Sequence, residues 1–211
     1  MAHKEDNADR PFGTLITSIG GVGSSFFIKF FNEQGLDTNT NKFKTGTSPY
    51  KHAMTPPERT CIKRAIFMYG NPYNAVLSIE KRNLQIKHMI NKKIDCEKLS
   101  KSKEEKYKIK KPLTEWTEDP YEIKDQLDNW MNAKTNYPIM FLKYEEIWNN
   151  LDSIFDFLDV EKSKIKKFPK NKKRKSDWKS EDEKVKEALQ RVYSGVYETM
   201  ESMDGCFIKG E

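Results

Sequence analysis

Residues 14–28 read TLITSIGGVGSSFFI, and this stretch decides the fold. Its first six residues are β-branched or apolar except for one serine, which is typical of a short buried strand. A turn with three glycines and two serines follows, and the apolar run from Phe26 predicts a helix that ends at Gly35. This order directs backbone N–H groups and the positive end of a helix dipole to one point, which suits a bound phosphate or sulfate. The alternative is that the glycines only permit a tight turn and close packing.

The glycine-rich turn departs from the common nucleotide-binding motifs. The Walker motif needs a lysine before its Ser or Thr, but Gly23 precedes Ser24. The Rossmann motif needs a third glycine where Phe26 stands. A kinase-type glycine loop needs a catalytic Asp-Asn loop, which we do not find. What remains is a phosphate-binding turn without its own lysine, so the missing cation must come from elsewhere in the fold.

Strands and helices alternate along the rest of the chain. The pattern predicts further strands at 64–69 and 139–143, and helices at 73–90, 120–133, 144–158 and 180–203. Such alternation is typical of parallel strands. We therefore predict an α/β fold, a three-layer α/β/α sandwich with a central, mostly parallel sheet and a phosphate-binding loop after the first strand. We expect a flexible tail at 1–11 and one domain over 12–211, in which the polar segment 92–118 forms a lid or insert.

The composition indicates a folded chain. Of 211 residues, 36% are hydrophobic and 12% aromatic, and disordered chains are poor in aromatic residues. No run of about 18 apolar residues is present, so we expect no membrane span, and residues 1–10 lack the apolar core of a signal peptide. Three widely spaced cysteines suggest neither a disulfide framework nor a zinc site. We therefore expect a cytoplasmic location and no metal.

The net charge of +6 is concentrated in two lysine-rich segments. Nine of the 14 residues at 162–175 are Lys or Arg, and six lysines lie within 101–111. Each segment is either a solvated surface or a clamp for phosphate groups. Nucleic acid is one anionic partner that such a segment could bind, but we do not expect it, because the zinc-finger, RNA-binding and basic-helix signatures are missing. A small anionic nucleotide is an equally good physical partner for the 162–175 segment.

Five segments carry a resemblance to a known family. They are GVGSS at 21–25, KHAMTPP at 51–57, GNPYNAVLS at 70–78, FLKYE at 141–145 and RKSDWK at 174–179. In order and spacing they resemble motifs of the sulfotransferases that use 3′-phosphoadenosine 5′-phosphosulfate (PAPS). The similarity extends over about residues 14–179, which is most of the chain. It implies transfer of a sulfuryl group to a hydroxyl or amine of a carbohydrate or small-molecule acceptor, with adenosine 3′,5′-bisphosphate as product.

The resemblance also implies roles for individual residues. His52 is the candidate base, since an imidazole with an ordinary pKa of about 6.5 suits removal of the acceptor proton. Lys51 is the candidate for a cation near the transferring group. Arg82 lies one helical turn after Ser78 and could reach the same phosphate. The expected cofactor-binding residues are Gly20, Gly21, Val22, Gly23, Ser24, Ser25, Ser78, Arg82, Arg174, Lys175 and Ser176.

Two departures from the family pattern leave alternatives open. Gly21 stands where the family usually has a lysine, and Gly70 stands where it usually has an arginine. Both usual residues are cations that contact the donor. Besides an active sulfotransferase, the sequence is therefore compatible with a catalytically impaired module that binds a nucleotide without turnover. A nucleotide or metabolite kinase and a nucleic-acid binder are further alternatives, and neither the acceptor nor the oligomeric state can be read from the sequence.

Overall fold

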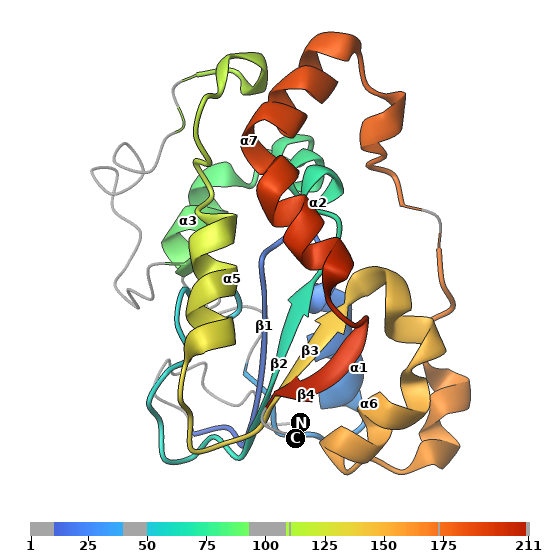
Figure 1. The fold of residues 1–211 in the computed structure, drawn as a ribbon. Helices are drawn as coiled ribbons and strands as arrows, with labels where there is room; N and C mark the ends of the chain where they lie inside the picture. Colours follow the sequence, from blue (N-terminus) through green and yellow to red (C-terminus); the bar gives the residue numbers. More distant parts are fainter. Residues whose placement is uncertain (1–10, 40–49, 93–108, 110, 173, 210–211) are drawn as a thin grey trace.

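The computed structural model describes residues 11–39, 50–92, 109, 111–172 and 174–209 (Figure 1). All of the predicted tail at 1–11 except Pro11, and most of the predicted lid at 92–118, lie outside these residues. The described part contains one sheet of four strands in the order β1-β2-β3-β4. The strands are β1 (Thr14–Ser18), β2 (Arg64–Tyr69), β3 (Ile139–Lys143) and β4 (Cys206–Lys209).

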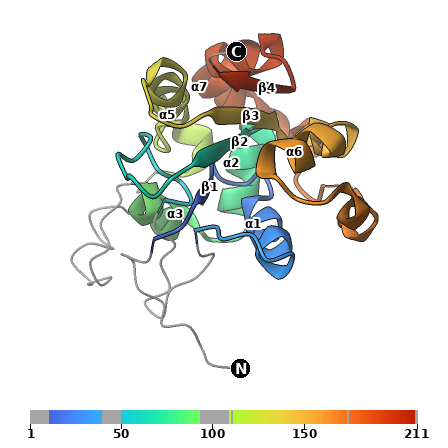
Figure 2. The ribbon, with the colours of Figure 1, turned by 90° about the horizontal axis from the view of Figure 1, so that it is seen from below.

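The first three strands are parallel, which confirms the α/β class and the mostly parallel sheet. Thr14 pairs with Arg64, and Ala65 pairs with Ile139, whereas β4 runs antiparallel to β3. All five residues of β1 are buried, as expected for a strand covered on both faces. Figure 2 shows α1 (Ser24–Glu33) and α6 (Leu151–Leu158) on one side of the sheet, and α3 (Gln85–Lys92) and α5 (Ile123–Asn132) on the other.

Three of the predicted helices differ from the observed ones. The segment predicted as one helix at 73–90 is two, α2 (Pro72–Glu80) and α3, because Asn83 adopts a φ of +51° between them. The helix predicted from residue 120 begins at Ile123, since the Asp119 carboxylate accepts hydrogen bonds from the Tyr121 and Ile123 amides. The segment 144–158 starts as a 3₁₀ helix, Tyr144–Asn149, and only then becomes α6.

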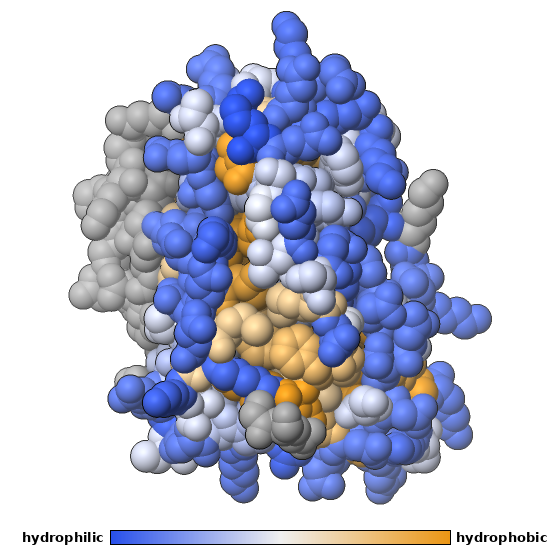
Figure 3. Space-filling view, viewed as in Figure 1, coloured by the Kyte–Doolittle hydropathy of each residue, from blue (hydrophilic) through white to orange (hydrophobic). Residues whose placement is uncertain are grey.

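The C-terminal region contains the long helix α7 (Glu183–Ser202) and the strand β4, which the sequence did not predict. The strand is four residues long and lies at the edge of the sheet, where Phe207 stacks on Phe141 with ring centroids 5.1 Å apart. Figure 3 shows an apolar area where β4 lies below α7, surrounded by polar side chains. Among the described residues, no helix has the length and apolar character required to cross a membrane.

The other edge of β1 is closed by short segments from later in the chain. Thr38 forms a parallel bridge to Thr14. The Asn39 side-chain amide makes the hydrogen bonds that a neighbouring strand would make. Its Oδ1 accepts from the Ile16 amide (2.8 Å), and its Nδ2 donates to the Ile16 carbonyl (3.0 Å). The Ser18 amide then donates to the Lys51 carbonyl at 2.9 Å. β1 is therefore bonded on both edges, by β2 on one side and by these short segments on the other. In open α/β sheets, ligands bind outside the carboxyl ends of the strands.

Candidate anion-binding site

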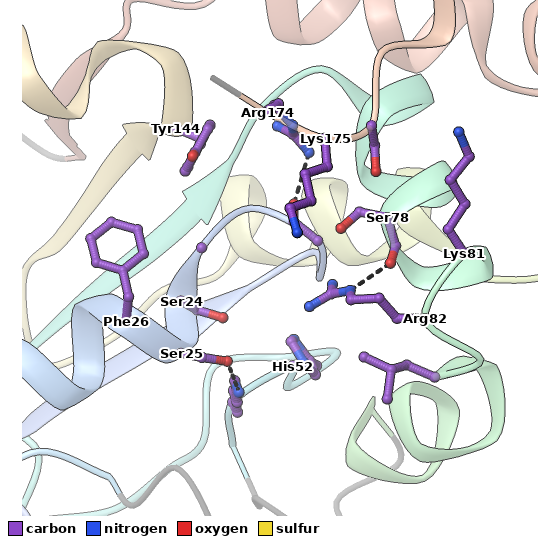
Figure 4. A pocket seen from close by; sticks show the side chains of 15 residues that line it. Ser24, Ser25, Phe26, His52, Ser78, Lys81, Arg82, Tyr144, Arg174 and Lys175 are labelled. Carbon is purple, nitrogen blue, oxygen red and sulfur yellow. Dashed lines mark hydrogen bonds between the residues drawn. The ribbon is translucent and has the colours of Figure 1, made fainter. Parts of the chain in front are cut away.

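A pocket of about 580 Å³ lies at the carboxyl end of β1. Figure 4 shows side chains from distant parts of the chain converging around the glycine turn. The lining residues are Gly21, Gly23, Ser24, Ser25, Phe26, Lys51, His52, Ser78, Lys81, Arg82, Leu84, Tyr144, Arg174, Lys175 and Ser176. Five of them are cations, and none of them is a carboxylate in the part of the chain that the structure describes. The pocket is therefore suited to a ligand with several negative charges.

The turn between β1 and α1 requires glycine at two of the positions that line the pocket. Gly21 and Gly23 have φ values of +66° and +79°. A Cβ at Gly21 would lie 2.4 Å from the Ala75 carbonyl oxygen in α2, and a Cβ at Gly23 would lie 2.6 Å from the Phe26 ring. The positive φ makes a side chain unfavourable at both positions, and the overlap with the Ala75 backbone excludes one at Gly21. A lysine at position 21 is therefore incompatible with this backbone.

Helix α1 begins where the turn ends, and its first backbone amides need hydrogen-bond partners from outside the helix. Gly23 is the N-cap of α1, and no side chain of the described residues caps the helix. The first amides of a helix have no partner within the helix. The Ser18 hydroxyl ties the region together, because it accepts from the Gly20 amide (3.2 Å) and donates to the Ser24 hydroxyl (2.9 Å). The serine hydroxyls and the helix start together form a group of donors that suits an anion.

The pocket cations come from three different segments, and most of them are bonded to neighbouring residues. Lys51 donates to the Ser25 hydroxyl at 2.6 Å, and Arg82 donates to the Ser78 carbonyl at 2.6 Å. Lys81 pairs with Glu181. Arg174 donates to the Gly21 carbonyl at 2.8 Å and to Glu145.

The charged forms of the two pocket arginines are less favourable in the folded chain than in water. Burial, followed by the positive charge of Arg174, lowers the pKa of Arg82, and burial also lowers the pKa of Arg174. Figure 4 shows both side chains, together with Lys175, around the same space beside the glycine turn. Like charges that face one pocket repel each other, so an anion bound between them relieves that repulsion.

His52 is buried at the edge of the pocket and is neutral at physiological pH. Its Nδ1 lies 3.0 Å from the Ser18 carbonyl oxygen, which only accepts, so Nδ1 carries the proton and Nε2 carries the lone pair. Burial, followed by the positive charge of Lys51, lowers the pKa of His52 to about 3. A neutral imidazole can accept a proton, but with a pKa this low it is a weak base until a bound anion offsets the nearby positive charges.

His88 forms a second buried imidazole directly beneath the turn. Its ring centroid lies 4.5 Å from that of His52, and a Cβ on Gly20 would lie 2.4 Å from the His88 ring. Within the described residues, its Nε2 is buried without a hydrogen-bond partner. Burial, followed by the influence of His52, lowers the pKa of His88 well below its ordinary value. Both rings are therefore neutral packing partners under the glycine turn.

The structure brings together eleven of the thirteen residues that the sequence selected. Gly20 and Val22 do not line the pocket: the Gly20 amide donates to Ser18, and the Val22 side chain is fully buried. The sequence analysis missed Lys81 as a pocket residue. It also gave no role to Phe26, Leu84 or Tyr144 in the lining. The position of Lys81 directly before Arg82 at the end of α2 could have suggested it.

No family model, curated protein or solved structure matches this chain. The similarity to sulfotransferases therefore rests on the motifs and their spacing alone. The pocket has to be interpreted from its own residues, whose charge and donor groups favour a polyanionic ligand.

The steric limit at the turn predicts a difference between two glycine substitutions. Gly35 also has a positive φ (+92°), but a Cβ there meets no atom within 4 Å. Gly35→Ala should lower the free energy of unfolding by about 1 kcal/mol from backbone strain alone. Gly21→Ala should cost about 2–4 kcal/mol, because it adds an overlap with the Ala75 backbone. Urea denaturation of both variants measures the difference, and equal costs would contradict the described turn.

The two buried imidazoles predict how stability depends on pH. In the unfolded chain both bind a proton near pH 6.5, whereas in the folded chain both remain neutral to much lower pH. The unfolded state thus binds more protons, and stability falls as the pH drops below about 6.5, by up to about 1.4 kcal/mol per pH unit for each histidine.

Proton NMR of the histidine ring signals measures this directly, with His52→Asn and His88→Asn variants to assign the signals. We expect no titration of either ring between pH 8 and pH 5. A midpoint of His52 or His88 near pH 6.5 would show that the ring is not buried as described.

Proposed function

We propose that this chain is a sulfotransferase that moves a sulfuryl group from PAPS to a hydroxyl or amine of a carbohydrate or small-molecule acceptor. The observation that carries the proposal is the convergence of the glycine turn, His52 and five cations on one pocket. The proposal includes a finer description of the fold: a three-layer α/β/α sandwich whose phosphate-binding loop follows β1. The spacing of the sequence motifs supports the same function.

The pocket residues fit the donor in charge, size and hydrogen-bonding groups. Its volume of about 580 Å³ lies within the range of pockets that hold a drug-sized ligand. The amides at the start of α1 and the hydroxyls of Ser24 and Ser25 would hold the 5′-phosphosulfate. Ser78, Arg82 and the 174–176 segment would hold the 3′-phosphate. Charge-assisted hydrogen bonds of this kind are among the strongest that a pocket can offer.

The chain's own residues then perform three tasks. PAPS supplies the sulfuryl group and, as leaving group, a nucleotide phosphate. His52 accepts the proton of the acceptor at Nε2, while Nδ1–H remains bonded to the Ser18 carbonyl. Lys51, already 2.6 Å from the Ser25 hydroxyl, places positive charge beside the transferring group. The remaining cations hold the nucleotide in position.

A second candidate function is a nucleotide-binding module without turnover. The burial of His52, which holds its pKa at about 3, favours this alternative, because a base with so low a pKa removes a hydroxyl proton poorly. The exclusion of a lysine at position 21 favours it as well. The two candidates share the ligand and differ in whether transfer follows, so binding and transfer have to be measured separately.

Adenosine 3′,5′-bisphosphate should bind and stabilise the folded chain. A ligand that binds only the folded state raises the melting temperature, by an amount that grows with its concentration over Kd. Adenosine 5′-monophosphate lacks the 3′-phosphate and should raise it less. Differential scanning fluorimetry with both nucleotides measures the effect. The absence of any shift at millimolar bisphosphate would contradict both candidate functions.

His52→Asn should abolish transfer while nucleotide binding is kept. The asparagine amide can still donate to the Ser18 carbonyl, but the variant has no lone pair equivalent to that of Nε2. Loss of a general base typically lowers the rate by about 10²–10⁴-fold. The assay follows labelled sulfate from PAPS to a panel of sugars, phenols and amines. Unchanged transfer by the variant would show that His52 is not the base, and a wild-type chain that binds without any transfer would favour the binding module.

A further inference from the structure

The Arg174 side chain occupies a defined position between the glycine turn and Glu145. Its Nη2 donates to the Gly21 carbonyl (2.8 Å), and its Nη1 donates to Glu145 Oε1 (3.2 Å). The guanidinium carbon also lies 4.9 Å from the centre of the Tyr144 ring. Only 17% of the side chain is exposed. Three separate contacts thus fix this cation, although it comes from a loop far along the chain.

This guanidinium lies near Gly21 and Gly70, the two positions where the resembled motifs have a lysine and an arginine. It bonds to Gly21 itself, where a lysine is sterically excluded. Its partner Glu145 occupies the space next to Gly70, since a Cβ on Gly70 would lie 2.8 Å from Glu145 Oε2. A large side chain at position 70 would therefore displace the carboxylate that holds Arg174. Arg174 therefore places positive charge beside Gly21, while the carboxylate that holds it lies beside Gly70.

Arg174 has hydrogen-bonding capacity left for a ligand. An arginine has five N–H groups, and within the described residues two of them are used, on Gly21 and on Glu145. Arg174 lines the pocket, whereas Glu145 does not. Because the planar guanidinium is oriented by its existing bonds, its remaining N–H groups have a fixed direction before a ligand arrives.

We propose that Glu145 is a positioning residue of the anion pocket, which holds the Arg174 guanidinium at the glycine turn so that its remaining N–H groups bind the ligand's phosphate or sulfate. For a nucleotide ligand, this inference rests on the proposed function. It predicts that a negative charge beside an anion pocket strengthens anion binding. Simple electrostatics predicts the opposite, because removal of a nearby carboxylate should attract anions more strongly. The sign of the effect therefore separates the two explanations.

The test compares Glu145→Gln with a matched variant one residue along the same 3₁₀ helix. Glu146→Gln changes the charge equally, but Glu146 accepts from Asn149 and does not line the pocket or contact Arg174. Isothermal titration calorimetry with adenosine 3′,5′-bisphosphate, and with inorganic sulfate as a second probe, measures affinity. Glu145→Gln should weaken binding of both by about tenfold, the usual cost of a lost charge-assisted contact, and Glu146→Gln should leave it unchanged or slightly tighter.

Two Arg174 variants show whether Glu145 acts through this arginine. Arg174→Ala should weaken binding by tenfold or more, and Arg174→Lys should restore little of it, since lysine cannot bond to Gly21 and Glu145 as a planar fork. In the Arg174→Ala background, Glu145→Gln should add no further loss. A double variant that loses another tenfold would show that Glu145 acts on its own and would overturn the inference. So would tighter or unchanged binding by the single Glu145→Gln variant.

The two probes distinguish failure of this inference from failure of the proposed function. If sulfate binds but the bisphosphate does not, the proposed function is wrong, and the sulfate data still decide the role of Glu145. If the bisphosphate binds and Glu145→Gln binds it equally well, only the positioning role is wrong. A wild-type chain that binds neither probe overturns both.

Discussion

The close approach of the glycine turn to helix α2 is the constraint on which the rest of the site depends. A Cβ added to Gly21 would lie only 2.4 Å from the Ala75 carbonyl oxygen. The backbone of the turn therefore lies very close to the first turn of α2. This contact brings Ser78 and Arg82 next to the start of α1. It also removes the room for a cation on the turn itself. The positive charge of the pocket therefore comes from Lys51 before β2, from Lys81 and Arg82 after α2, and from Arg174 and Lys175 after α6.

The distribution of charge around the turn follows from that constraint. Lys51, Arg82 and Arg174 reach the same pocket from three segments. Burial lowers the pKa of both arginines, and the positive charge of Arg174 lowers the pKa of Arg82 further. The neighbouring imidazole of His52 remains neutral for similar reasons. A polyanion bound here would lower the free energy of all these groups at once, and it would raise the pKa of His52 toward a value useful in proton transfer.

Much of this arrangement was predictable because it is local. The strand, glycine turn and helix at 14–33 follow from residue patterns, and the parallel sheet follows from the alternation of elements. The hydrophobic pattern also located β2 and β3. It missed β4, because four residues with one charge give too short a signal. It also missed the break between α2 and α3, which depends on a positive φ at Asn83.

The pocket's finer features depend on contacts between distant residues, which no local pattern contains. Gly20 and Val22 belong to the predicted motif, yet one amide turns to Ser18 and one side chain packs into the core. Lys81 lines the pocket because α2 ends there. Nothing in the residues around Arg174 indicates that it would bond to Gly21, 153 positions earlier.

The central claim is that the backbone amides at the start of α1 and the surrounding cations bind one shared anion. Amide NMR of ¹⁵N-labelled protein during titration with adenosine 3′,5′-bisphosphate tests it most directly. We predict that the amide protons of residues 22–25 move downfield as they bond to a phosphate, together with changes in the side-chain signals of Arg82 and Arg174. Shifts confined to other parts of the chain, with these amides unchanged at saturation, would contradict the account.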